Sequence, residues 1–125
     1  MTVYLTKGDG RTRVKLQANT IGDDLVVSIY NENAHLGAVA VGEYDPEHQR
    51  ASVSVITRLG HKDDALAQRA AHSISKATKK PVCVIAGIHL ENITQKEIDE
   101  ISKNAVSAVE EFINSSVAEE GGEKT

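Results

Sequence analysis

The apolar residues of this chain change their spacing part-way along it, and this change constrains the fold more than any other feature. Up to about residue 56, apolar residues alternate with polar ones or form short runs. Between residues 62 and 78 they recur three and four positions apart. Alternation is typical of β-strands, and the wider spacing is typical of amphipathic helices. The first half of the chain is therefore expected to form strands, and the second half to be built around helices.

Five short segments of the first half read as strands, because glycine, asparagine, aspartate or proline punctuates the chain between them. The expected strands cover residues 3–5, 14–18, 25–30, 36–42 and 51–56. The segment 36–42 is apolar on both faces and rich in small residues. Such a pattern predicts a central strand that is covered on both sides.

The second half predicts a helix over residues 62–78, a buried strand over 82–86 and a further helix beyond Thr94. Thr94 and Glu97 have the spacing of a capping box, which marks a helix start. The fold class is therefore α+β, with a mostly antiparallel sheet of about six strands, two helices and the order β-β-β-β-β-α-β-α. Residues 1–114 are expected to form a single domain, and residues 115–125 a flexible C-terminal tail.

Composition excludes several classes of function. A formal net charge of −4 and an aromatic content of 3% argue against nucleic-acid partners. Apolar runs are too short for a membrane-spanning helix, so no membrane partner is expected. A single cysteine cannot form an internal disulfide, which favours a cytoplasmic location. That residue, Cys83, lies in an apolar segment and is interpreted as a small buried hydrophobic side chain.

The strand directions predict that several loops meet at one edge of the sheet. Short connections make consecutive strands antiparallel, so the loop 31–35 lies at the same edge as the end of strand 51–56. The helix 62–78 returns the chain, so the end of strand 82–86 reaches that edge as well. The polar residues expected there are Lys7, Arg11, His35, Arg58, His61, Lys62, Asp63, Asp64 and His89.

Three interpretations of this edge remain open. In the first, the three histidines and a nearby aspartate bind a metal such as zinc or iron. In the second, residues 60–63 bind an anion at a helix N-terminus, where free N–H groups and the helix dipole favour phosphate. Asp63 and Asp64 oppose that second interpretation unless they cap the helix or hold a cation. In the third, these are ordinary polar loop residues.

Three segments resemble a known family. They are HLGAVAV at 35–41, TRLGHKDD at 57–64 and AGIHLENITQKEI at 86–98. In these stretches the chain is similar to the prenylated-flavin (prFMN) chaperones of the LpdD-like family, which accompany UbiD-type decarboxylases such as gallate decarboxylase. The similarity covers roughly two-thirds of the chain, residues 35–112.

The resemblance implies a fold similar to small proteasome-assembly chaperones, a homodimer and a role without catalysis. It implies that the chain binds reduced prenylated FMN, or FMN, through the phosphate and delivers it to a UbiD-type decarboxylase. The residues expected to bind the cofactor are Arg58, Gly60, His61, Lys62, Asp63 and Gly87. A divalent metal held by His35, His61 and His89 would bridge to the phosphate. Since aromatic residues are scarce, the isoalloxazine would lie on aliphatic surface, supplied in part by a second subunit.

Two alternatives compete with this carrier function. One is a metal-dependent hydrolase that uses the same three histidines, with Asp63 or Asp64 as the base. The other is an assembly chaperone that acts through its protein surface without any cofactor.

Overall fold

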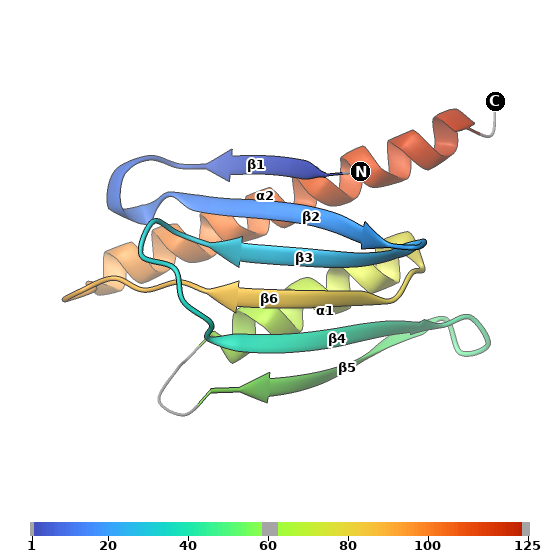
Figure 1. The fold of residues 1–125 in the computed structure, drawn as a ribbon, viewed down its shortest axis with the longest axis horizontal. Coiled ribbons are helices and arrows are strands. Elements are labelled where there is room, and N and C mark those ends of the chain that lie inside the picture. The colour runs from blue at the N-terminus through green and yellow to red at the C-terminus, as the bar shows by residue number, and fades with distance from the viewer. Residues whose placement is uncertain (1, 59–62, 124–125) are drawn as a thin grey trace.

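The structure is a computed structural model that describes residues 2–58 and 63–123, with side chains described as far as residue 118. Six strands form one sheet, and two helices pack against it (Figure 1). The elements are β1 (Val3–Lys7), a 3₁₀ turn η1 (Gly10–Thr12), β2 (Val14–Ile21), β3 (Asp24–Tyr30), β4 (Ala38–Asp45), β5 (Arg50–Thr57), α1 (Asp64–Thr78), β6 (Val82–Gly87) and α2 (Gln95–Glu123). This order confirms the predicted α+β class and the predicted sequence of strands and helices.

The strands lie in the order β1-β2-β3-β6-β4-β5. β3 pairs with β6 in parallel, and the other described pairings are antiparallel, so the sheet is mostly antiparallel as predicted. α1 carries the chain from β5 over the sheet, and β6 then inserts between β3 and β4. This insertion places the end of β6 beside the loop that joins β3 to β4.

Local sequence accounts for the end of α1 and the start of α2. α1 ends at a lysine, Lys79, that adopts the left-handed conformation with φ 60°, and its N–H bonds the carbonyl of Ser75. α2 begins with the predicted capping box. The backbone N–H of Thr94 donates to the Glu97 carboxylate at 3.0 Å, and the N–H of Glu97 donates to the Thr94 hydroxyl at 3.1 Å.

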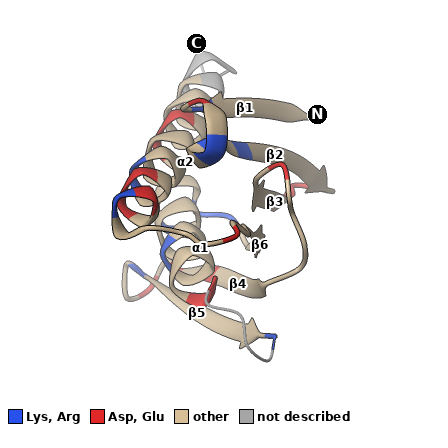
Figure 2. Ribbon diagram, turned by 90° about the vertical axis from the view of Figure 1, so that its left-hand side faces the viewer, with Lys and Arg blue, Asp and Glu red and all other residues tan. Residues whose placement is uncertain are grey.

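Both helices lie on the same face of the sheet, as an edge-on view shows (Figure 2). The buried apolar side chains are aliphatic apart from one aromatic residue, Phe112 of α2, which is 1% exposed. Alanines of α1 allow it to approach β4 closely. A Cβ placed on Gly42 would lie 2.5 Å from the carbonyl oxygen of Ala71, so the strand needs glycine there.

The structure corrects the expectation that strand 36–42 is covered on both sides. The helices cover only one face of β4, and Val41 on the opposite face is 49% exposed. Cys83 is likewise half-buried rather than buried, because it points to the same uncovered face. We call this side of the sheet the open face. Its central residues are Val26, Val39, Val41, Ser54, Ile56, Cys83 and Ile85.

The ends of the helices also differ from the expected boundaries. α1 begins at Asp64 instead of residue 62, and α2 continues to Glu123. Helical backbone therefore extends beyond residue 114, while the flexibility of a tail over residues 115–125 stays a prediction. No described helix is both long enough and apolar enough to cross a membrane.

Candidate functional site

The predicted meeting of loops at one edge of the sheet is present. β3, β5 and β6 all end at this edge, and β4 begins there (Figure 1). We call it the rim, and define it as residues 31–37, Arg58, Asp63 and residues 87–91. Gly60, His61 and Lys62, three of the predicted site residues, lie outside the described residues.

Two of the three predicted histidines are close together at the rim. The ring centroids of His35 and His89 are 5.2 Å apart, with 52° between the ring planes. They come from segments that are separated by more than fifty residues in the sequence. Because both strands end at the rim, the sheet brings these two imidazoles together.

Gly87 and Asn31 hold this histidine pair in place. A side chain on Gly87 would collide with the backbone carbonyl of His35, so glycine allows the loop 31–37 to cross the end of β6. The side chain of Asn31 is 4% exposed. It donates to the carbonyl oxygen of His89 at 2.8 Å and accepts from the N–H of His89 at 3.2 Å. The loop after β3 is thus fastened to the segment after β6.

Asp63 and Arg58 approach the same loop from the other side. The Asp63 carboxylate lies against the α-carbon of Gly37, where any side chain would displace it. The Arg58 guanidinium donates to the carbonyl oxygen of Leu36 at 2.9 Å, and the Arg58 N–H donates to that of Gly37 at 3.0 Å. One cation and one anion therefore flank the loop that carries His35.

His89 has an acidic neighbour. Its Nε2–H donates to Glu91 at 2.9 Å, and this hydrogen bond, with the charge of the imidazole, lowers the pKa of the Glu91 carboxyl. The end of the molecule that carries the rim shows acidic and basic residues side by side (Figure 2). The rim is therefore not a purely basic surface.

Two predicted cations of this edge form ion pairs with α2. Lys7 pairs with Glu111 of α2 at 2.6 Å, and Arg11 pairs with Glu97 at 2.6 Å. The hydrogen bond from Arg11, followed by that from the backbone of Thr94, lowers the pKa of Glu97 to about 2. Both cations therefore fasten α2 to the β1–β2 connection, and Arg11 also donates to the carbonyl oxygen of Glu91 in the rim at 2.8 Å.

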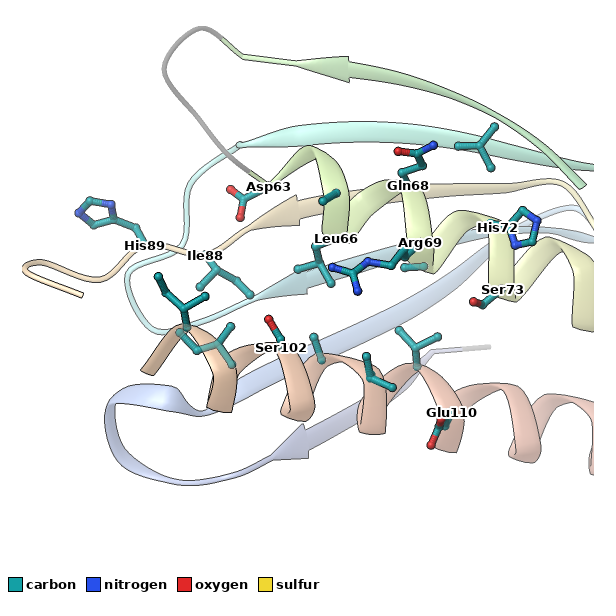
Figure 3. A pocket seen from close by; sticks show the side chains of 18 of the residues that line it. Asp63, Leu66, Gln68, Arg69, His72, Ser73, Ile88, His89, Ser102 and Glu110 are labelled. Carbon is teal, nitrogen blue, oxygen red and sulfur yellow. The ribbon is translucent and has the colours of Figure 1, made fainter. Parts of the chain in front are cut away.

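A groove between α1 and α2 opens from the rim, and sequence reasoning did not predict it. Its volume is about 840 Å³. Asp63 and His89 lie at one end, Leu66 and Arg69 of α1 face the middle, and Glu110 of α2 lies toward the other end (Figure 3). The aliphatic side chains that line it are Val53, Leu66, Ile88, Leu90, Ile93, Ile98, Ile101, Val106, Val109 and Ile113.

The sequence held one signal for this groove. Ile98 and Val106 lie on the same helix as buried Ile101 and Val109, yet they are 40% and 48% exposed. The apolar stripe of α2 is thus wider than the contact with the sheet requires. A groove of this size falls within the usual range for small-molecule sites, roughly 300–1,000 Å³.

Among the described residues, one group of three side chains is close enough together to hold a metal ion, and it lies away from the rim. They are Asp45, Glu47 and His48, in the turn between β4 and β5. His48 Nδ1–H donates to Asp45 at 2.6 Å, which lowers the pKa of that carboxyl. This turn is at the opposite edge from the rim (Figure 1).

Comparisons with known proteins agree with this architecture. A family model described as "Prenylated flavin chaperone LpdD-like domain" matches residues 8–116. Among solved structures, a chain from a chaperone complex for yeast 20S proteasome assembly is similar. The TM-score is 0.61 at 15% sequence identity, over 95% of this chain and 96% of that chain. At that identity the likeness shows the fold alone. No curated protein matches the chain.

Proposed function

Because the chain belongs to the prenylated flavin chaperone LpdD-like family, we propose that it is a non-catalytic carrier of prenylated FMN, or FMN. It binds the cofactor at the rim and in the adjoining groove, and delivers it to a UbiD-type decarboxylase. The observation that carries this proposal is that the rim and the groove are continuous. A polar rim with two imidazoles, a cation and a carboxylate opens directly into an aliphatic groove. Such a combination suits an amphipathic ligand with one anionic end.

The phosphate binds at the rim, between the end of β5 and the start of α1. Arg58 supplies a guanidinium, and the first turn of α1 supplies backbone N–H groups that have no acceptor within the helix, together with the positive end of the helix dipole. Residues 60–62 contribute a glycine, a histidine and a lysine to the same connection. Gly87 and Asp63 border the site, with Asp63 orienting the loop that carries His35.

A divalent metal fits part of this arrangement. The centroid separation of 5.2 Å between His35 and His89 allows both imidazoles to approach one ion, given a metal–nitrogen distance of about 2.0–2.1 Å for zinc. A tetrahedral site needs four ligands, so His61 and a phosphate oxygen would complete the set. A bound cation would also offset the repulsion between a phosphate and the carboxylates of Asp63 and Asp64.

The ring system of the flavin lies in the groove between α1 and α2. Apolar side chains form most of its walls, so burial of the apolar part of the ring system is driven by removal of surface from water. Contact with these aliphatic walls takes the place of aromatic stacking, which a chain with so few aromatic residues cannot supply. The proposal also includes a homodimer and a cytoplasmic location, where the apo-decarboxylase would receive the cofactor.

Retention of prenylated FMN after anaerobic gel filtration tests this function. We expect the wild-type protein to retain the cofactor, and Arg58→Ala and His35→Ala to retain much less. His48→Ala, which removes an exposed histidine at the opposite edge, is the matched control and should retain as much as wild type. Loaded protein should then activate an apo-decarboxylase. Retention no better than that of an unrelated protein with the same net charge would overturn the proposal.

A further inference from the structure

The groove between α1 and α2 contains an arginine, Arg69 of α1, that lies away from the rim. Among the described residues that line the groove, it is the one lysine or arginine, and most of the others are apolar. No hydrogen bond or ion pair joins its guanidinium to another residue of the described chain. This cation is therefore available to a ligand that enters the groove.

The helical repeat places Arg69 on the flank of α1 that faces α2. Leu66, Arg69 and Ser73 are three and four positions apart and all line the groove, so they share that flank. Ala67 and Ala71 lie on another side of the helix and are fully buried. In Figure 3 the Arg69 side chain lies beside that of Leu66, between the two helices. The guanidinium is thus presented to the groove and is not part of the contact between α1 and the sheet.

Arg69 also lies at a suitable distance from the rim. With a rise of about 1.5 Å per residue, it is about 9 Å along the helix axis from Asp63, which borders the proposed phosphate site. In FMN, a ribityl chain separates the phosphate from the ring system. A phosphate at the rim therefore leaves the ring in the middle of the groove, beside Arg69, while Glu110 lies toward the far end (Figure 3).

The flavin ring system has two unlike edges. The pyrimidine edge carries carbonyl oxygens and ring nitrogens, and the opposite edge is hydrocarbon. We propose that Arg69 is a specificity-determining residue of the groove: its guanidinium binds the pyrimidine edge, and the hydrocarbon edge packs against aliphatic side chains of α2. This inference rests on the proposed function, and it adds the residue that selects the orientation and the redox state of the ring.

Contact with a guanidinium favours the reduced ring. When reduced and ionised at N1, the ring carries a negative charge shared between N1 and the C2 carbonyl oxygen, whereas the oxidised ring is neutral. The two forms differ by two electrons and the proton on N5. The guanidinium offers parallel N–H donors to two adjacent acceptors, and such hydrogen bonds are stronger when the acceptor is charged. Without this partner, the apolar walls would disfavour the anion.

Anaerobic titration of the protein with reduced FMN and with oxidised FMN tests this inference. We expect wild-type protein to bind reduced FMN about tenfold or more tightly than oxidised FMN, because the acceptor is charged only in the reduced form. A tenfold preference raises the two-electron midpoint potential of the bound flavin by about 30 mV, which spectroelectrochemistry measures independently. Arg69→Gln should abolish the preference. Arg69→Lys should retain part of it, because the charge stays and the planar fork is lost.

Arg50→Gln is the matched control. It removes the same group from an exposed position at the start of β5, outside the groove, and should keep the wild-type ratio of affinities. Arg69 is also exposed, so its variants should unfold at the wild-type temperature.

Equal affinity of wild-type protein for the two forms of FMN would overturn the inference, as would a failure to bind either form. It would also be overturned if Arg69→Gln weakened the binding of both forms by the same factor. Retention of prenylated FMN by wild-type protein is measured separately, so the carrier function and the role of Arg69 can fail independently.

Discussion

At the scale of single residues, the shape of the rim depends on two kinds of residue. Some side chains hydrogen-bond to the backbone of the rim loops, and glycines allow two backbone segments to approach closely. Asn31 bonds both backbone groups of His89, and Gly87 admits the backbone of His35. Neither residue carries charge or catalytic chemistry. Their role is to hold two imidazoles, from distant parts of the chain, in one place.

Asn31→Ala is expected to destabilise the protein by about 1–3 kcal/mol, because it leaves the N–H and carbonyl of His89 without their partner in a part-buried position. Urea unfolding measures the change. Gln95→Ala removes an exposed side-chain hydrogen bond to Asp99 and should alter stability by less than about 0.5 kcal/mol. If both variants lost the same free energy of unfolding, the Asn31 hydrogen bonds would contribute no more to stability than an exposed hydrogen bond does.

The ion pair of Glu97 with Arg11 predicts a pH dependence of stability. Its folded-state pKa of about 2 lies below the ordinary value of 4.5. The stabilisation is therefore complete above about pH 4.5 and disappears as the pH falls toward 2. Glu97→Gln should lower the melting temperature at pH 7, and the difference from wild type should shrink on acidification across that window.

Thermal melts at several pH values check this directly. Glu100→Gln alters an exposed carboxylate 3.9 Å from Lys96 and should follow the wild-type profile closely. A Glu97→Gln variant whose deficit is the same at pH 7 and pH 2 would contradict the assignment.

At the scale of elements, the close approach of α1 to the sheet sets the shape of the molecule. Small residues on one stripe of the helix, Ala67, Ala70 and Ala71, are fully or almost fully buried. The periodicity of the sequence predicted this helix, the capping box of α2 and the strand order along the chain. It did not predict the order of the strands in the sheet. β6 inserts between β3 and β4, and its pairing with strands far away in the sequence is not visible in the local pattern of residues.

Ala71→Leu is expected to cost about 1–3 kcal/mol of stability, because the larger side chain would push α1 away from β4 and Gly42. Ala77→Leu makes the same change on the exposed side of the helix and should be nearly neutral. Chemical denaturation of both variants distinguishes them. If Ala71→Leu were as stable as Ala77→Leu, the helix would not be packed as closely as described.

At the scale of the whole molecule, the two faces of the sheet have different roles. One face carries both helices, with the groove between them opening at the rim. The other carries no helix, and its central residues are mostly apolar. Sequence reasoning predicted the edge where His35 and His89 meet, since strand direction alone determines it. The groove was not predicted, because it depends on how far apart two helices lie, and that distance follows from side-chain packing.

The central claim is that the rim recognises a phosphate and the groove an apolar ring. The most direct measurement is the anaerobic dissociation constant of wild-type protein for prenylated FMN, compared with that for the same compound after enzymatic removal of its phosphate. Charge-assisted hydrogen bonds contribute about 1.5–3 kcal/mol each. We therefore predict that removing the phosphate weakens binding by about tenfold or more. Equal affinity for the two compounds would contradict the account.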